Sequence, residues 1–120
     1  MPLTLLIAAT LAQAAPAAPA RLNPEQSDAR CVVILGFIGQ QPNQTPQRIE
    51  AVRTGTAYYM GKMRGRNPRI VFGPTLNAAA QLAQAQKVDV VQESQRCGKE
   101  LTDLAASQGQ RPASPTPRKP

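Results

Sequence analysis

The densest group of chemically active side chains in this sequence is a run of four cations within eight residues. They are Lys62, Arg64, Arg66 and Arg69, with Gly65 among them. Cations near the C-terminus of a helix interact favourably with its dipole, and guanidinium groups bind phosphate or sulfate through paired hydrogen bonds. The cluster is therefore a candidate anion-binding site. The alternative interpretation is a solvated turn whose charges stabilise the end of a helix.

The two cysteines, Cys31 and Cys97, are the other residues with distinctive chemistry. They form no CxxC motif, and the chain has no histidine, so they predict neither a redox pair nor a zinc site. In an oxidising compartment an isolated pair most simply forms one disulfide. Closing so long a loop stabilises a fold by about 4 kcal/mol on the chain-entropy model. The alternative is two unpaired cysteines buried as small hydrophobic side chains.

The remaining polar residues match no catalytic pattern. Without histidine the chain lacks the commonest general base, and its serines have no base partner. Glu100 can share a helical face with Glu93 or Asp103, but nothing in the sequence indicates a cleft around such a pair. The glycines match neither a dinucleotide-binding nor a P-loop motif. We therefore expect no enzymatic activity, no metal and no cofactor.

The chain is strongly basic, with 14 Lys and Arg against 7 Asp and Glu and a net charge of +7. Such a charge attracts anionic partners. Single-stranded nucleic acid is usually bound with the help of stacking aromatic side chains, and only Tyr58 and Tyr59 lie near the cluster. We therefore expect an anionic membrane or lipopolysaccharide surface, rather than nucleic acid, as the partner of the cluster.

Residues 1–20 carry no charged side chain and have the pattern of a signal peptide. The apolar stretch 3–11 is too short to cross a membrane, which takes about 20 residues. Small residues fit cleavage after Ala14, and Ala20 offers a second site. No Lys or Arg precedes the apolar core, so the alternative is an Ala/Pro leader of a cytosolic protein. We expect export to the periplasm or beyond the cell.

Helical periodicity runs through residues 21–106, so the sequence predicts one all-α domain. Asn23-Pro24, with Gln26 completing a capping box, and Thr45-Pro46 are typical helix starts. Asp89 is expected to cap the last helix after a bend. The predicted helices span residues 24–40, 46–63, 74–87 and 89–106. Residues 107–120 form a basic, Pro-rich tail that is expected to be disordered.

Each predicted helix carries an apolar stripe at steps of three and four residues. The first stripe is the widest, so that helix is expected to be central. The inward positions are Cys31, Ile34, Leu35 and Ile38; Ile49, Val52, Thr56, Tyr59 and Met63; Leu76, Ala79, Ala80 and Ala83; and Val90, Ser94, Cys97, Leu101 and Leu104. A disulfide would therefore join the first and last helices of a four-helix bundle. The basic cluster lies off these stripes, so the fold is not expected to depend on it.

Two further features, one within the predicted helix 46–63 and one after it, carry open interpretations. Gly55 and Gly61 mark either a close approach to a neighbouring helix or fraying near the helix end. Segment 69–72 is either a short strand or a helical turn, and we interpret it as an apolar plug over the core.

The pattern of Cys31, then Tyr58-Tyr59-Met60-Gly61-Lys62, then residues 64–68 and Cys97-Gly98 resembles small secreted helical proteins of Gram-negative bacteria. The resemblance covers residues 28–104 and implies a compact, disulfide-bonded helical fold; that group has no known activity. The architecture is also similar to that of periplasmic acid-stress chaperones. We expect a non-enzymatic binding or accessory module that contacts a protein partner. An acid-stress chaperone and an anionic-surface binder are the alternatives.

Overall fold

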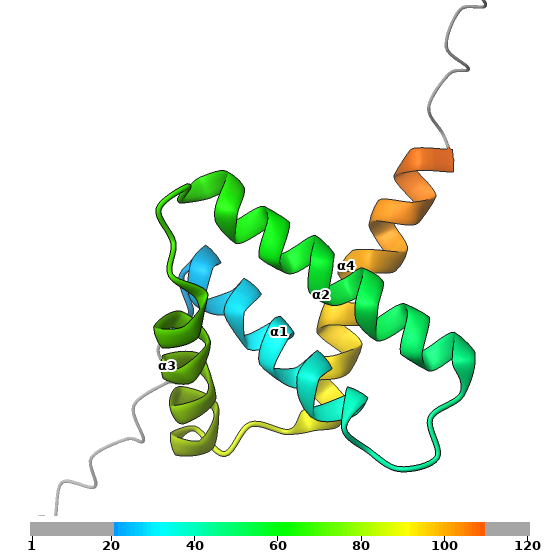
Figure 1. Cartoon of the computed structure of the whole chain (residues 1–120), viewed down its shortest axis with the longest axis horizontal. Helices are drawn as coiled ribbons and strands as arrows, with labels where there is room; N and C mark the ends of the chain where they lie inside the picture. Colours follow the sequence, from blue (N-terminus) through cyan, green and yellow to red (C-terminus); the bar gives the residue numbers. More distant parts are fainter. Residues whose placement is uncertain (1–20, 110–120) are drawn as a thin grey trace, which may run out of the picture.

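The computed structural model describes residues 21–109, which form four helices and no strand (Figure 1). The helices are α1 (Pro24–Gly39), α2 (Pro46–Arg66), α3 (Phe72–Ala85) and α4 (Val90–Gly109). The predicted all-α fold of four helices is confirmed. The predicted signal peptide with its cleavage sites, and the predicted tail from residue 110 onward, lie outside the described residues.

The helices begin where side chains satisfy their first N–H groups. The Asn23 side chain accepts a 2.8 Å hydrogen bond from the backbone of Gln26, whose own side chain accepts a 3.1 Å bond in return. Thr45 and Asp89 each accept one from the backbone three residues on, at 3.2 and 3.0 Å. These side chains satisfy donors that would otherwise be left unpaired at a helix start. All three predicted caps are therefore confirmed.

Six helix boundaries differ from the prediction: the end of α1 and the start of α4 by one residue, and the end of α3, at Ala85, by two, with the other three as follows. α2 continues to Arg66 and ends at Asn67, which precedes a proline and leaves the helical conformation. α3 begins two residues earlier than predicted, at Phe72. Pro74 is tolerated within its first turn, because N–H groups there have no acceptor inside the helix and the one that proline lacks is not needed. α4 continues to Gly109, so residues 107–109 are helical and not part of a tail.

α1 is the central helix, as predicted, and it packs against each of the other three (Figure 1). Five of its apolar residues are at most 9 % exposed: Ala29, Cys31, Val32, Ile34 and Leu35. The other helices add Tyr59, Met63, Ala79 and Cys97 to the core. Between α2 and α3 only Ile70 of the predicted plug is buried, whereas Val71 is 66 % exposed. Phe72, the first residue of α3, is partly buried against the core, so the plug consists of Ile70 and Phe72.

Two positions on α2 show how closely the helices approach. A Cβ atom at Gly55 would lie 2.9 Å from Leu35 and 3.0 Å from Leu101, so this glycine marks a close approach of α1 and α4. A Cβ at Gly61 would meet nothing within 4 Å. Ile49 was expected to face inward, but it is 42 % exposed because the first turn of α2 extends beyond the end of α1 (Figure 1).

Candidate functional site

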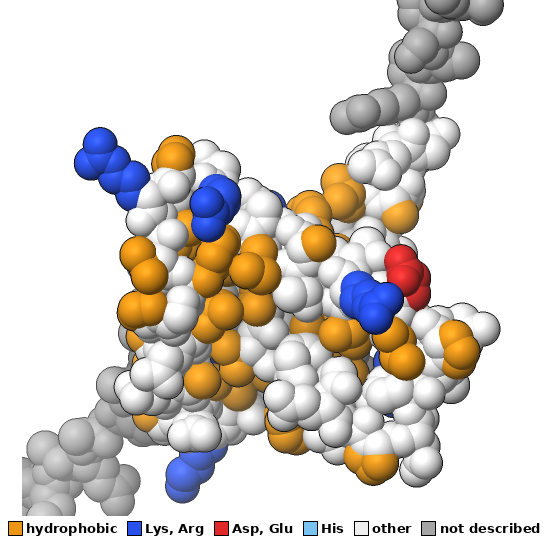
Figure 2. All heavy atoms as spheres, viewed as in Figure 1, with side chains coloured by type: hydrophobic (Ala, Val, Ile, Leu, Met, Phe, Trp, Pro, Cys, Tyr) orange, Lys and Arg blue, Asp and Glu red, His pale blue; other side chains and the backbone are white. Residues whose placement is uncertain are grey.

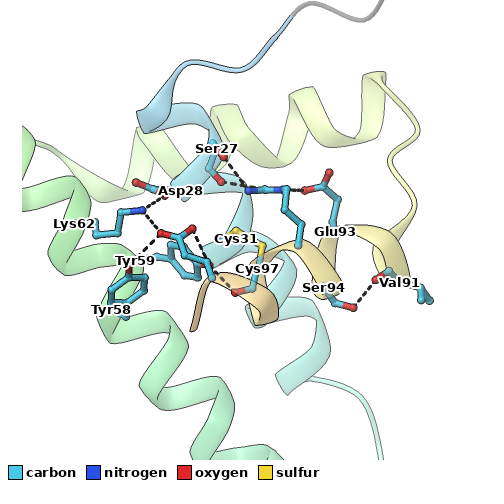
Figure 3. The surroundings of a disulfide bond; sticks show 12 residues. Ser27, Asp28, Cys31, Tyr58, Tyr59, Lys62, Val91, Glu93, Ser94 and Cys97 are labelled. Carbon is cyan, nitrogen blue, oxygen red and sulfur yellow. Dashed lines mark hydrogen bonds and ion pairs between the residues drawn. A yellow bond between two sulfur atoms is a disulfide. The ribbon is translucent and has the colours of Figure 1, made fainter. Parts of the chain in front are cut away.

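The predicted disulfide is formed between Cys31 on α1 and Cys97 on α4 (Figure 3). Their Cα atoms are 5.7 Å apart, and both side chains are fully buried. This separation is ordinary for a disulfide. The bridge attaches α4 to the middle of the central helix.

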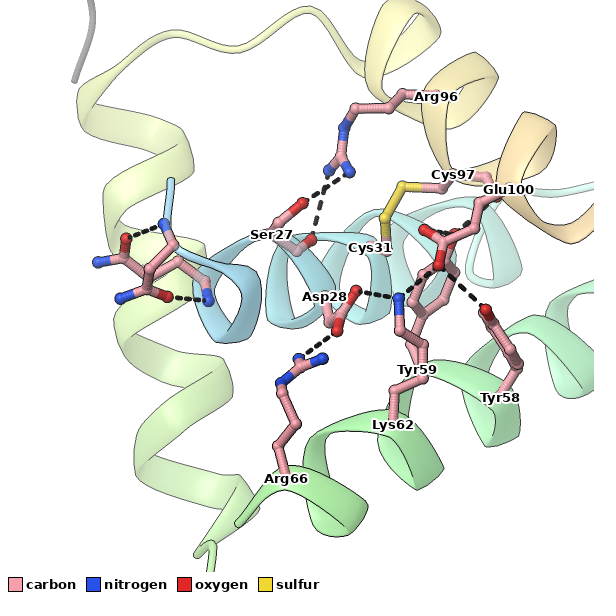
Figure 4. Close-up of polar contacts among 12 residues, drawn as sticks. Ser27, Asp28, Cys31, Tyr58, Tyr59, Lys62, Arg66, Arg96, Cys97 and Glu100 are labelled. Atoms are coloured by element: carbon pink, nitrogen blue, oxygen red, sulfur yellow. Dashed lines mark hydrogen bonds and ion pairs between the residues drawn. A yellow bond between two sulfur atoms is a disulfide. The ribbon is translucent and has the colours of Figure 1, made fainter. Parts of the chain in front are cut away.

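A polar cluster surrounds the disulfide and is centred on Glu100, one turn after Cys97. The Glu100 carboxylate accepts hydrogen bonds from Lys62, from the Tyr58 hydroxyl at 3.0 Å and from the Tyr59 hydroxyl at 3.3 Å (Figures 3 and 4). The Tyr59 hydroxyl also donates to the backbone carbonyl of Cys97 at 2.7 Å. α2 therefore holds α4 through polar contacts beside the covalent bond.

A second carboxylate, Asp28, extends this cluster to α1. Its side chain is only 5 % exposed, and it pairs with Lys62 at 3.0 Å and with Arg66 (Figure 4). A buried charge is tolerated only when it is paired and hydrogen-bonded. Lys62 thus lies between Asp28 and Glu100 and links α1, α2 and α4. We call Asp28, Tyr58, Tyr59, Lys62 and Glu100 the Lys62 cluster.

The pKa shifts in the Lys62 cluster favour the charged forms of Lys62 and Glu100, as expected of an ion pair that joins two helices. Burial alone would raise the pKa of Glu100, but hydrogen bonds from Lys62 and Tyr58 and the Lys62 charge lower it below 4.5. Burial alone would lower the pKa of Lys62, but its bonds to Glu100 and Asp28 raise it above 10.5. Burial and the Glu100 charge raise the pKa of Tyr59. Lys62 and Glu100 therefore stay charged across neutral pH, where a general acid–base catalyst needs a pKa near 7.

The structure separates the four cations that were expected to act together. Lys62 and Arg66 turn towards Asp28. The Arg64 guanidinium lies over the Phe72 ring, 5.0 Å from its centroid, and Arg69 lies exposed in the connection after α2. Lys62 and Arg66 thus make contacts to the fold that the sequence did not predict, because both pair with a buried carboxylate.

A pocket that the sequence did not predict lies between α1 and α3. Its volume is about 280 Å³, and its walls are mostly apolar. α1 contributes Phe37, which is 50 % exposed, and α3 contributes Ala80 and Ala83. The pocket exists because these alanines are too short to fill the space opposite the larger side chains of α1. Lys87, after the end of α3, contributes the one charged side chain of the lining.

Within residues 21–109 no group of three or more His, Cys, Asp or Glu side chains is placed to hold a metal ion. None of the described helices combines the length and the apolarity needed to cross a bilayer.

Comparison with protein-family models, with curated proteins and with solved structures finds no match for this chain.

Proposed function

We propose that this protein is an exported, non-enzymatic binding module that contacts a protein partner, and that the α1–α3 pocket receives an apolar side chain of that partner. The observation that carries this proposal is the pocket itself, about 280 Å³ in volume and apolar, beside the half-exposed ring of Phe37. Binding energy at protein interfaces concentrates where aromatic anchors and well-packed pockets meet. An apolar cavity of about 150 Å³ accommodates benzene, so this pocket is large enough for a leucine or phenylalanine side chain.

The helix that forms one wall of the pocket supports this role. α1 is tied to α4 by the disulfide and to α2 by the ion pairs of Asp28. Its position is therefore fixed before any partner arrives. A pre-organised surface loses less conformational freedom on binding and gains affinity for that reason.

Export is supported by the signal-like pattern of residues 1–20 and by the disulfide, which is compatible with an oxidising compartment. We place the binding module in the periplasm, or outside the cell, on these two grounds.

Native affinity capture from periplasm tests the proposal when it is paired with matched variants. Phe37→Ser alters the rim of the pocket, whereas Ile49→Ser alters a similarly exposed apolar residue on the first turn of α2. A stoichiometric partner should be recovered by the parent and by Ile49→Ser but not by Phe37→Ser. The purified partner should then bind the parent with a negative heat-capacity change, the signature of apolar burial. Repeated capture without a stoichiometric partner, or equal binding by Phe37→Ser, would count against the proposal.

The Lys62 cluster favours a second candidate, an acid-stress chaperone. Protonating all seven carboxylates would change the net charge from +7 to +14 and would break the ion pairs that join α1, α2 and α4. Self-repulsion could then expand the helices while the disulfide keeps α1 and α4 attached. Suppression of client aggregation at about pH 2–3, with none at pH 7, is the expected result. A chain that stays compact there, or that protects no client, removes this candidate.

A further inference from the structure

We propose that the corner between α2 and α3 docks onto an anionic phospholipid bilayer. In this arrangement Arg64 and Arg69 contact headgroup phosphates, and Val71 enters the interface between them. We call these three residues the α2–α3 corner. The proposal is independent of the α1–α3 pocket and of its protein partner.

The corner lies in a part of the chain that has no acidic residue. Between Glu50 and Asp89 the sequence contains six Lys or Arg residues and no Asp or Glu. Lys62 and Arg66 are paired with the Asp28 carboxylate. Arg64 and Arg69 form no ion pair with any residue between 21 and 109, so their charges are available to an external anion.

An exposed apolar side chain, Val71, follows Arg69 by two residues. Val71 is 66 % exposed, more than any other large hydrophobic residue of the described chain. Its neighbours Ile70 and Phe72 both pack against the core. Because the residues on each side are anchored, the exposed position of Val71 is fixed by the fold. Figure 2 shows Lys or Arg side chains next to hydrophobic ones at the end of the molecule where α2 meets α3.

The backbone and one side-chain contact hold the corner in place. The N–H groups of Arg69 and Ile70 donate to the side chain and carbonyl of Asn67, at 3.2 and 3.0 Å. The Arg64 guanidinium lies over the Phe72 ring, which keeps it beside the start of α3. The corner therefore presents its cations and its valine together without first having to be ordered.

This combination fits a bilayer better than a soluble polyanion. Amphipathic surfaces bind membranes by burying apolar groups in the headgroup region while cations attract anionic lipids. Each cation near such a surface changes partitioning about fivefold, an effect screened over roughly 8 Å at physiological salt. A soluble polyanion would use the arginines but would leave Val71 in water.

Vesicle co-sedimentation with charge-matched variants tests the electrostatic part. The corner variant is Arg64→Gln/Arg69→Gln, and its control, on the first half of α2, is Arg48→Gln/Arg53→Gln. Each removes two exposed cations, so the net charge falls equally. On phosphatidylglycerol vesicles at low salt, the corner variant should partition about 25-fold more weakly than the parent. The Arg48/Arg53 variant should change less than threefold. Equal losses in the two variants, or no loss in the corner variant, would overturn the proposal.

Tryptophan fluorescence tests whether the apolar residue enters the bilayer. Because the chain contains no tryptophan, a single introduced one reports only on its own position. Val71→Trp should shift its emission to the blue on phosphatidylglycerol vesicles and not on phosphatidylcholine vesicles. Val91→Trp, at a valine that is 64 % exposed on α4, should show no shift. Soluble glycerol phosphate should leave the emission of both variants unchanged. A blue shift with glycerol phosphate alone, or an equal shift at both positions on vesicles, would rule out bilayer docking through this corner.

Discussion

At the scale of single residues, Lys62 contacts more charged and aromatic partners than its partly exposed position on α2 would suggest. Its ammonium pairs with Asp28 and Glu100 and lies 5.5 Å from the ring centroids of Tyr58 and Tyr59. Replacing it with methionine should lower the free energy of unfolding by about 2 kcal/mol, because two carboxylates lose a partner and one of them is buried. Urea denaturation followed by circular dichroism measures the change.

Lys99→Met is the matched control for that variant. The ion pair of Lys99 with Asp103 is exposed on α4 and spans a single helical turn. Exposed pairs of this kind contribute little, so the control should change the free energy of unfolding by at most about 0.5 kcal/mol. Similar losses in the two variants would mean that Lys62 acts only as a surface charge.

Two glycines on α2 should respond to alanine in opposite directions. Gly61→Ala adds a methyl group in open space, so it should raise the free energy of unfolding by up to about 1 kcal/mol through helix propensity. Gly55→Ala places the same methyl group 2.9 Å from Leu35 and 3.0 Å from Leu101. The cost of overpacking there, about 1–3 kcal/mol, should outweigh the propensity gain. Thermal melts of both variants test this, and a stabilised Gly55→Ala would show that the two leucines can move aside.

At the scale of helices, local signals predicted the starts of the helices and the inward stripes well. The caps at Asn23, Thr45 and Asp89 act within four residues, so the sequence contains everything needed to recognise them. Ile49 was assigned wrongly because a stripe shows which face of a helix is apolar but not how far the neighbouring helix extends. The length of α1, not the periodicity of α2, leaves Ile49 exposed.

The candidate sites were less predictable, because they depend on pairs of residues far apart in the chain. Asp28 lies three residues before Cys31, on the buried side of α1. A carboxylate on that side needs cationic partners, and this much could be inferred from the sequence. Nothing in the local sequence identifies Lys62 and Arg66 as those partners. The pocket is similar: the sequence places the alanines of α3 on its inward face, and only the packing against α1 shows that they leave a space.

The Lys62 cluster should make the attachment of α4 depend on pH. The pKa of Glu100 is lower than 4.5 in the folded state, so its contribution to stability is present above that pH and is lost as the pH falls through the folded value. The pKa values of Lys62 and Tyr59 are raised, so their contributions are lost as the pH rises above about 10. Stability should therefore be greatest between these limits.

Urea midpoints measured from pH 3 to pH 7 on the parent and on Glu100→Gln test the acid side. Asp28, Lys62, Tyr58 and Tyr59 face Glu100 in both proteins, so the difference between the two curves isolates Glu100. The parent should lose stability more steeply below pH 4.5. Parallel curves would show that Glu100 does not couple acid to unfolding.

At the scale of the whole molecule, the charges are unevenly distributed. Every acidic residue lies at or before Glu50 or at or after Asp89, so the end of α2 and all of α3 are cationic or neutral. Asp28 on α1 and Glu100 on α4 pair with cations of α2, whereas Arg64 and Arg69, close to where α2 meets α3, pair with none of the described carboxylates. One uneven distribution thus both stabilises the fold and leaves a positively charged surface.

The disulfide should have the largest single effect on stability, and its loss should act first on α4. Cys31→Ser/Cys97→Ser should lower the free energy of unfolding by about 4 kcal/mol on the chain-entropy model, a large part of the 5–15 kcal/mol typical of a domain.

α4 has a single fully buried residue, Cys97, and its last turns extend away from the other helices (Figure 1). Without the bridge α4 is held by Leu101 against the core and by polar contacts that include those of Glu100 and Arg96. Hydrogen exchange should therefore accelerate more in α4 than in α1, α2 or α3, because segments with few buried contacts open at the lowest free energy. Equal acceleration in all four helices would instead mean that the fold opens as one cooperative unit and that the bridge stabilises it only through the unfolded chain.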